Sequence, residues 1–239
     1  MSIKTVLFDL DGTLLPMDLN VFVKDYFTSM ARKLAPHGYE SEKLIASIWA
    51  GTQAMVKNDG SKTNEQVFWD TFCAFHGESA RDHLYIFEEF YKLDFPKVQK
   101  SCGYDPRAAR VVEKCKALGM RVALATNPIF PSAATKQRTA WAGLDINDFE
   151  LVTTYENSRH CKPNLDYYRA VLEKLGADPT ECLMVGNDVT EDMVAKELEM
   201  KVFLLTDCII NKEGADISVY PNGSFDELCE FITQCNVQR

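Results

Sequence analysis

Two carboxylates separated by a single residue follow an apolar run near the start of the sequence. The run at residues 5–8 (TVLF) leads directly into Asp9-Leu10-Asp11-Gly12-Thr13. While the chain stays extended, this spacing points both acids to one side, and Gly12 permits the sharp turn that follows. Two such acids can divide the labour, because one can attack or bind a metal while the other moves protons.

The same acid pair could also have a structural role or bind calcium. The acids could simply cap a turn, and the pattern D-x-D-G also occurs in calcium-binding loops. A calcium loop carries a further acid and a distant glutamate at fixed spacings, and neither stands at those places when the loop is counted from Asp9. The sequence therefore disfavours calcium and leaves a catalytic pair or a turn cap.

Two further polar groups follow later in the chain. Thr126 and Asn127 end an apolar run and precede a predicted helix, where a hydroxyl and main-chain amides can bind a phosphoryl oxygen or cap the helix. Lys162 stands in a loop directly before another predicted helix. A lone lysine in a loop is usually solvated, so its position in the fold decides its meaning.

The last polar group is Gly186-Asn187-Asp188, with Asp192 four residues after Asp188 on the same face of a predicted helix. Asp188 and Glu191 have the form of a helix capping box. Carboxylate oxygens are also the ligands of a hard divalent cation, so Asp188 can bind a metal while Asp192 orients it or its waters. The two roles are compatible.

The elements that must position these residues alternate regularly. Four apolar runs have the composition of buried strands: residues 5–8, 121–125, 182–185 and 201–205. Three helical patterns accompany the later runs: residues 105–118, 164–175 and 188–199. This alternation predicts an α/β fold, a Rossmann-like parallel sheet with helices on both faces. Ligands gather at the carboxyl ends of strands in such a sheet, so all four polar groups are expected at one edge.

Residues 16–100 follow a different rhythm. Apolar residues recur there at helical spacing, for example at Val23, Phe27, Met30 and Leu34. We predict an all-helical domain of residues 16–100, inserted after the first strand of a core formed by residues 1–15 and 101–239. Its larger aromatic side chains are expected inside the bundle: Phe22, Tyr26, Trp49 and Trp69.

Composition and charge restrict the class of protein. The 239 residues are 46% hydrophobic and 26% charged, which is ordinary for a globular protein with a sizeable core. The net charge of −9 argues against a nucleic-acid or anionic-membrane partner, and no apolar stretch approaches the roughly 20 residues that span a bilayer. The start of the chain does not resemble a secretory signal, and the eight cysteines form no C-x-x-C pair. We therefore expect a cytoplasmic protein with reduced thiols.

In order and placement, the four polar groups resemble the four motifs of the haloacid dehalogenase superfamily. The matching residues are Asp9, Asp11, Gly12, Thr13, Thr126, Lys162, Gly186, Asn187, Asp188 and Asp192. The helical stretch looks like that superfamily's cap domain in its helical form. One position departs from the pattern, because aspartate usually follows the glycine of the fourth motif directly, whereas Asn187 stands there in this chain.

The resemblance implies a magnesium-dependent phosphatase acting on a small phosphorylated metabolite. Asp9 would be the nucleophile that becomes an aspartyl-phosphate, and Asp11 would protonate the leaving oxygen and later activate water. Mg²⁺ would be held by Asp9, the main-chain carbonyl of Asp11, and either Asp188 or Asn187. The four-residue spacing from Asp188 to Asp192 matches the paired acids of the superfamily and favours Asp188, with Asn187 and Asp192 as supporting residues. Four residues would hold the transferring phosphoryl group: Leu10 and Asn127 through main-chain amides, Thr126 and Lys162 through side chains.

Three alternatives remain open. A dehalogenase of the same superfamily would use the aspartate on carbon without magnesium, although Asp11 argues against it. A phosphoglucomutase-like enzyme needs the same core and passes the phosphoryl group to a sugar hydroxyl. A phosphate-binding regulatory protein of the receiver-domain type also combines acids, threonine and lysine, but its phosphorylated aspartate lies mid-chain. The sequence leaves the physiological substrate and the oligomeric state open.

Overall fold

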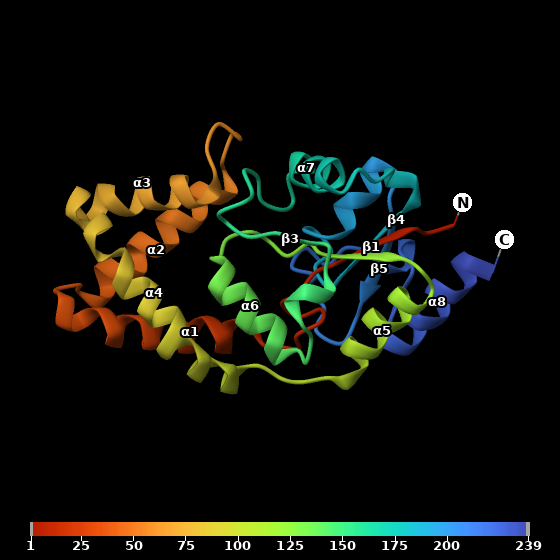
Figure 1. Ribbon diagram of the computed structural model, residues 1–239, viewed down its shortest axis with the longest axis horizontal. Coiled ribbons are helices and arrows are strands. Elements are labelled where there is room, and N and C mark those ends of the chain that lie inside the picture. Colours follow the sequence, from red (N-terminus) through yellow and green to blue (C-terminus); the bar gives the residue numbers. More distant parts are fainter. Residues whose placement is uncertain (1, 238–239) are drawn as a thin grey trace.

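A computed structural model describes residues 2–237 as a parallel β-sheet flanked by helices, with an entirely helical part at one end (Figure 1). The strands lie in the order β3-β2-β1-β4-β5-β6, and every neighbouring pair is parallel. Their bounds are β1 Thr5–Phe8, β2 Arg121–Leu124, β3 Leu151–Val152, β4 Cys182–Gly186, β5 Lys201–Leu205 and β6 Asn222–Gly223. The predicted α/β fold class is confirmed.

The first strand of the chain lies in the middle of the sheet. All four residues of β1 are buried, as are all five of β4, because helices cover both faces of a parallel sheet. β2 and β4 pair with β1 on its two sides. The segments that follow these three strands therefore leave the same edge of the sheet next to one another.

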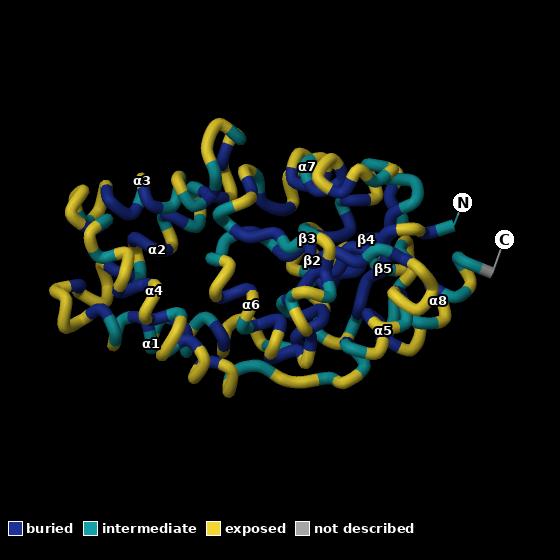
Figure 2. The backbone as a smooth tube through the Cα atoms, viewed as in Figure 1, coloured by how far each residue is buried: buried dark blue, intermediate teal, exposed yellow. Residues whose placement is uncertain are grey.

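Helices cover both faces of the sheet. Val6 and Phe8 of β1 belong to the apolar cluster that includes α5 (Pro106–Ala117), α6 (Ser132–Trp141) and α8 (Phe225–Val237), whereas Leu7 packs with α7 (Leu165–Leu175) and the 3₁₀ helix Met193–Leu198. The alternation follows from the two-residue repeat of a strand. Figure 2 shows the strands as buried backbone between these layers.

The helical part lies between β1 and α5 in the sequence, and we refer to residues 18–101 as the helical segment. It contains α1 (Leu19–Leu34), α2 (Ser41–Val56), α3 (Asn64–His76), α4 (Leu84–Leu93) and a 3₁₀ helix at Phe95–Ser101. The buried face of α1 carries Phe22, Tyr26, Met30 and Leu34. The stripe predicted from the sequence is therefore shifted by one position at its start, because Val23 and Phe27 are only half-buried.

One aromatic residue of the helical segment is not where the sequence predicted it. Trp69 is 4% exposed, as expected for the interior of a bundle, but 45% of Trp49 is exposed. Trp49 contacts the half-buried Phe27, with ring centroids 5.4 Å apart. Phe27 packs against the edge of the core, and the exposed Trp49 ring lies on its outer side.

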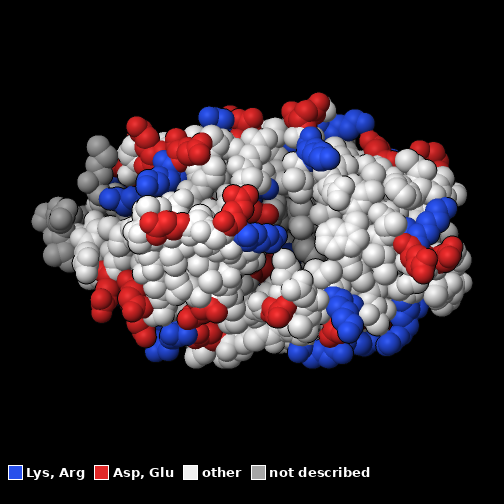
Figure 3. Space-filling model, turned by 180° about the vertical axis from the view of Figure 1, so that it is seen from behind, with Lys and Arg blue, Asp and Glu red and all other residues white. Residues whose placement is uncertain are grey.

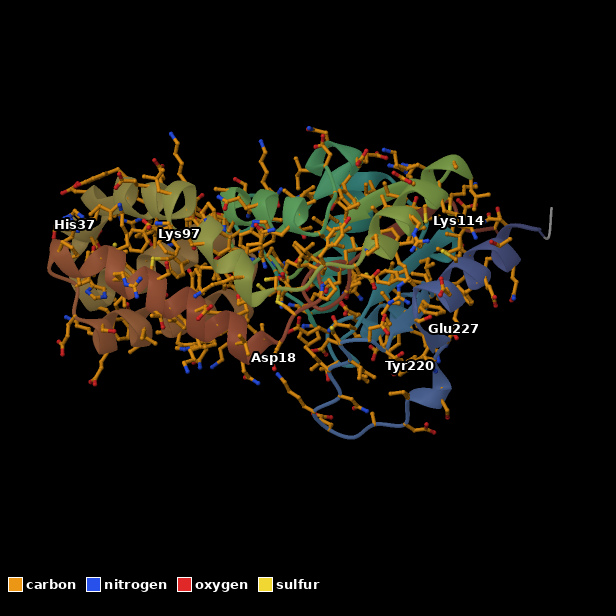
Figure 4. The ribbon with its side chains drawn as sticks, turned by 90° about the horizontal axis from the view of Figure 1, so that it is seen from below. Asp18, His37, Lys97, Lys114, Tyr220 and Glu227 are labelled. Carbon is orange, nitrogen blue, oxygen red and sulfur yellow. The ribbon has the colours of Figure 1, made fainter. Side chains whose placement is uncertain are left out.

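The chain passes between the sheet and the helical segment at two adjacent places. Met17 and Cys102 form an antiparallel bridge, and the Gly103 amide donates to the Pro16 carbonyl at 2.7 Å. Asp18 then begins α1, since its carboxylate accepts from the amides of two residues in the first turn. Figure 4 shows Asp18 at the junction of the two parts and His37 at the far end of the helical segment.

The segment after β4 differs from its prediction. The expected helix at residues 188–199 is a loop followed by the 3₁₀ helix Met193–Leu198. The Asp192 amide donates to the Asp188 carbonyl at 2.9 Å, which is a helical pairing, but the next turn tightens, since the Ala195 amide donates to the Asp192 carbonyl at 3.3 Å. The start of the loop is tied to a distant segment, because the Val189 amide donates to the Ile210 carbonyl and the Ile210 amide donates to the Asn187 carbonyl. Two short strands, β3 and β6, were not predicted, since two residues carry no periodicity.

The surface carries charges of both signs. Acidic and basic side chains are interspersed on the face shown in Figure 3, and a broad uncharged area lies over the helical segment. Within residues 2–237, all eight cysteines are free thiols. None of the helices in this range combines the length and the apolar character needed to cross a membrane.

Candidate active site

The polar groups predicted from the sequence meet at the carboxyl end of the central strands. Asp9 follows β1, Thr126 follows β2, and Asn187 follows β4. They line one cavity of about 1280 Å³. The same cavity is lined by the other polar residues of these loops: Asp11, Asn127, Asp188, Glu191 and Asp192.

Asp9 is held from two directions. Its Oδ1 accepts from Lys162 Nζ at 3.0 Å, and its Oδ2 lies 3.0 Å from the Thr13 hydroxyl. That hydroxyl is also 3.0 Å from Asn187 Oδ1, so its single proton can go to either acceptor. The side chain of Asp9 is 10% exposed and faces the cavity. Neighbouring Leu10 is fully buried and can reach a ligand only through its main chain.

Gly12 makes this tight arrangement possible. Its φ is +83°, which disfavours a side chain, and a Cβ at this position would lie 2.3 Å from Asn187 Nδ2. Gly186 is equally constrained, because a Cβ there would lie 2.0 Å from Asp192 Oδ2. Gly12 thus lets the turn after β1 approach the turn after β4, and Gly186 lets the Asp192 side chain pack against the end of β4.

Lys162 bridges two carboxylates in the interior. Its ammonium, 3.0 Å from Asp9 Oδ1, is also 2.6 Å from Asp192 Oδ1, and its side chain is fully buried. Burial alone would lower the pKa of Lys162, but the charges of Asp192 and Asp9 raise it well above its usual range. The lysine therefore stays protonated and supplies a fixed positive charge beside Asp9.

Arg138 is a residue of the site that the sequence did not indicate. It lies on α6, is completely buried, and donates from Nη1 to Asp11 Oδ2. Its guanidinium also lies over the Phe130 ring, 4.2 Å from the centroid. Burial raises the pKa of Asp11, and the charge of Arg138 opposes that rise. The sequence offered one signal, because Arg138 shares a helix face with the apolar Ala134. An arginine on a buried face requires a partner, since arginine is rarely buried without one.

The second polar group has a different local structure from the one predicted. Helix α6 begins at Ser132 after Pro131, so Thr126 and Asn127 lie in a loop and do not form a helix start. Thr126 is 2% exposed, and its carbonyl accepts from the hydroxyls of Thr153 and Tyr167. Asn127 is fixed by its own contact, since its Nδ2 donates to Glu191 Oε2 at 2.9 Å.

In the fourth polar group, Asn187 and Asp188 make different contacts. Asn187 is buried, with its Oδ1 beside the Thr13 hydroxyl and its Nδ2 donating to the Cys208 carbonyl at 2.6 Å. Asp188 is half-buried, and its Oδ1 accepts from the amides of Thr190 and Glu191. The capping interaction of Asp188 is thus present, but its reciprocal partner is Asp192, whose Oδ2 accepts from the Asp188 amide at 3.0 Å.

The charges around Asp9 do not balance. The cationic side chains in contact with the acids are Lys162 and Arg138. Five carboxyl groups gather here: Asp9, Asp11, Asp188, Glu191 and Asp192. Asp11 Oδ1 is buried and has no hydrogen-bond partner in the described chain. An excess of carboxylate oxygens with an unpartnered one fits a hard divalent cation.

The structure also limits how such a cation can be held. Across residues 2–237, no three side chains of His, Cys, Asp or Glu come together as a metal-binding cluster. Carboxylates of the described residues would therefore supply a pair of ligands, with amide or main-chain oxygen and substrate or water completing the shell. Mg²⁺ tolerates this, because it usually retains waters and binds through one or two carboxylates.

Glu191 provides a test of the electrostatics in metal-free buffer. Burial raises its pKa from 4.5 to about 7, against the opposing charge of Lys162. The native state therefore holds a proton that the unfolded state has lost, so its contribution to stability is complete below pH 4.5 and disappears as the pH rises through about 7. Glu191→Gln should raise the free energy of unfolding at pH 8 by roughly 1–3 kcal/mol and leave it unchanged at acidic pH.

Urea unfolding of both proteins across this pH range checks the expectation. Glu197→Gln, at an exposed glutamate nearby, is the matched control and should give a curve parallel to that of the native protein. Parallel curves for Glu191→Gln as well would show that Glu191 does not titrate with a raised pKa.

Fold and site together define a Rossmann-like α/β enzyme in which a buried lysine and a pair of acids meet at the end of the central strand. A family model described as haloacid dehalogenase-like hydrolase matches residues 3–197. The chain belongs to the haloacid dehalogenase-like hydrolase family, as its sequence motifs indicated.

Individual relatives support the same placement. Pyrophosphatase PpaX of Bacillus cereus (strain AH820) is 28% identical over 194 residues, which cover 79% of this chain and 76% of that protein. Two solved structures share the fold. They are 2-haloacid dehalogenase from Pseudomonas syringae pv. Tomato DC3000 (TM-score 0.64, 16% identity, 97% and 99% of the two chains) and the magnesium-bound HAD-hydrolase YfnB from Bacillus subtilis (TM-score 0.55, 15% identity, 97% and 99%).

Proposed function

We propose that this chain is a magnesium-dependent phosphatase that hydrolyses a small phosphomonoester through an aspartyl-phosphate on Asp9. The observation that carries the proposal is the contact of Asp9 with the buried cation of Lys162, at the point where Asp11 faces the same cavity. A fixed cation beside a carboxylate suits a reaction in which an anionic group must approach an anionic nucleophile. The phosphoryl chemistry in the name of the PpaX relative agrees with it.

The reaction uses the two acids in turn. One carboxylate oxygen of Asp9 forms a bond to phosphorus, the bond from phosphorus to the alcohol oxygen breaks, and the proton of Asp11 passes to that oxygen. Water then attacks the same phosphorus, Asp11 takes a proton from the water, and the bond from Asp9 to phosphorus breaks. Phosphate is released, and both acids return to their starting states.

The transferring phosphoryl group has donors on several sides. Lys162 is the cationic one, and the Thr126 hydroxyl lies at the cavity wall after β2. Main-chain amides near Leu10 and Asn127 complete the set in this proposal. Their positions are rigid because the loops are buried and internally bonded, so little reorganisation is needed as charge shifts in the transition state.

Asp9, the main-chain carbonyl of Asp11, and Asp188 would hold Mg²⁺. The ion would supply charge neutralisation between the nucleophile and the phosphate. The excess of carboxyl groups supports this assignment, and magnesium is bound in the YfnB structure that shares the fold. Asp192 positions Asp188 through its amide, while Asn187 ties the loop to Thr13.

The helical segment is proposed to act as a cap domain over the site. It contributes much of the cavity lining, and both of its connections pass through the Met17–Cys102 junction. Closing it over the substrate would exclude bulk water during attack on phosphorus, and opening it would admit the second water or release the product.

The two candidate metal ligands of the fourth motif can be separated by mutation. We expect Asp188→Ala to raise the magnesium concentration for half-maximal activity by at least about tenfold. Asn187→Ala should raise it much less, because the Asn187 amide is engaged by Thr13 and Cys208. Magnesium titrations of both variants with an aryl phosphate measure this difference, and the reverse ranking would overturn the choice of Asp188.

A panel of phosphomonoesters assayed with and without magnesium tests the proposed function as a whole. Release of inorganic phosphate that requires the ion is the expected result. A dehalogenase would instead release halide from a haloacid without the ion, and a mutase would convert a sugar phosphate to its isomer with little free phosphate. Either of these results in place of phosphate release would refute the proposal.

A further inference from the structure

The cavity is larger than a phosphoryl group requires. Its volume of about 1280 Å³ exceeds the roughly 300–1,000 Å³ of typical small-molecule sites. From Asp9 and Asp11 it extends between the sheet and the helical segment, where residues of α1, α2, α3 and α4 line it. This outer part must receive whatever is attached to the phosphoryl group, if the proposed function is correct.

Aromatic rings form much of this outer part. The helical segment contributes Phe27, Trp49 and Phe68, and Phe130 and Tyr155 face them from the other side. Ring centroids lie 5.4 Å apart for Phe27 and Trp49, and 6.4 Å apart for Phe68 and Tyr155. Trp49 is 45% exposed, and the other four are half-buried, so all retain surface that a ligand can cover.

Several polar side chains beside these rings already have hydrogen-bond partners. The hydroxyls of Tyr26 and Tyr91 both line the cavity and are hydrogen-bonded to each other at 2.9 Å. Arg138, which lies over Phe130, is committed to Asp11. An apolar group placed among these rings would leave the Tyr26–Tyr91 and Arg138–Asp11 contacts intact. The buried Trp69 Nε1, which has no hydrogen-bond partner in the described chain, is a donor of the lining that a ligand could meet.

The charged residues that the helical segment contributes to the cavity lining are all acidic. They are Asp18, Glu65 and Glu88, and the described part of that segment contributes no lysine or arginine to the lining. Glu156 adds a fourth acid from the core side. Burial and the nearby Glu156 both raise the pKa of Glu65, as expected for acids without a neutralising cation. The basic lining residue Lys212 is exposed in the loop after β5.

From this lining we propose that the substrate is the phosphomonoester of an apolar, aromatic alcohol that carries no second anionic group. The rings of the helical segment would cover the leaving group as it leaves water. A second phosphate or a carboxylate would lose hydration there without a cationic partner and would face acids instead. The proposal rests on the proposed function and specifies its substrate class.

Two compounds with the same reacting centre test the proposal directly. Benzyl phosphate and 4-carboxybenzyl phosphate differ only by a carboxylate remote from phosphorus. We expect kcat/KM to be at least about tenfold higher for benzyl phosphate, and pyrophosphate to be a worse substrate than either. Equal or higher kcat/KM for 4-carboxybenzyl phosphate or pyrophosphate would overturn the substrate class, while phosphatase activity itself would stand. Magnesium-dependent hydrolysis of none of them, nor of any phosphomonoester in the panel, would refute the proposed function as well.

Variants locate the preference on the helical segment. Trp49→Ala should lower kcat/KM for benzyl phosphate by roughly tenfold through loss of ring contact. Glu88→Lys should narrow the ratio between the two benzyl compounds by raising kcat/KM for 4-carboxybenzyl phosphate. Tyr85→Ala is the matched control, since Tyr85 is 59% exposed on α4 and does not line the cavity. An unchanged kcat/KM for benzyl phosphate in Trp49→Ala, an unchanged ratio in Glu88→Lys, or a change of either quantity in Tyr85→Ala would contradict recognition by this surface.

Discussion

Replacing Asp9 with asparagine is expected to lower kcat for an aryl phosphate by at least about a thousandfold. An amide oxygen is a poor nucleophile and cannot form the covalent intermediate. The shape of the side chain is nevertheless preserved, and Lys162 keeps its contact with Asp192 at 2.6 Å. Phosphate release under saturating magnesium measures the effect.

The folded state of the Asp9→Asn variant should be almost unchanged. The substitution removes one negative charge from a site with more acids than cations, so the free energy of unfolding should shift by no more than about 1 kcal/mol. Asp166→Asn, at a surface residue with a 53% exposed side chain, is the matched control for activity. Turnover of Asp9→Asn at the native rate would remove Asp9 as the nucleophile.

Arg138→Met is expected to give the largest loss of stability of any single change at the site. The variant leaves Asp11 with a mostly buried carboxylate and no cation, and breaking such a pair typically costs about 3–5 kcal/mol. Because Arg138 opposes the rise in the pKa of Asp11, its removal should raise that pKa further. The loss of stability should therefore grow as the pH rises, since the folded state must then ionise Asp11 without its partner.

Chemical denaturation of Arg138→Met between pH 5 and pH 8 in chelator measures both effects. Arg138→Lys retains the charge and should recover part of the stability, which keeps the test usable if the methionine variant does not fold. In Arg138→Lys, the alkaline limb of the pH profile of kcat/KM should lie closer to that of the native protein than in Arg138→Met. Arg169→Met, at an exposed ion pair, should change the free energy of unfolding by no more than about 0.5 kcal/mol. Equal losses for the two methionine variants would contradict the role given to Arg138.

The sheet could be predicted because its four longer strands have strong local signals. Strands such as β1 and β4 are buried throughout, so their sequences are continuously apolar, and turn residues mark their ends. The short strands β3 and β6 are defined by pairing with a neighbour and by nothing in their own sequence. A helix was predicted at residues 188–199, where the chain forms a turn followed by the 3₁₀ helix Met193–Leu198, because the periodicity of a short segment does not distinguish these from an α-helix.

The site residues that follow strand ends or stand beside turn residues could be predicted, because these positions also have local signals in the sequence. Asp9, Asp11 and Lys162 stand beside glycine, proline or strand ends, so their placement at one edge follows from the order of elements. Arg138 lies inside an ordinary helix, and only the packing of α6 brings it to Asp11. Trp49 has the spacing of a core residue, and its exposure depends on which neighbours the bundle provides.

The paired bridge at Met17 and Cys102 brings the two ends of the helical segment side by side. We therefore expect that a segment of another length or architecture can be spliced between those two residues without disturbing the register of the sheet, if it replaces the contacts that Asn64, Glu65 and Phe95 make with the core. Under the proposed function, recombination at this point would exchange the recognition of one alcohol for another while conserving the chemistry of phosphorus. A chimera that carries a foreign segment and still turns over small aryl phosphates would demonstrate that independence.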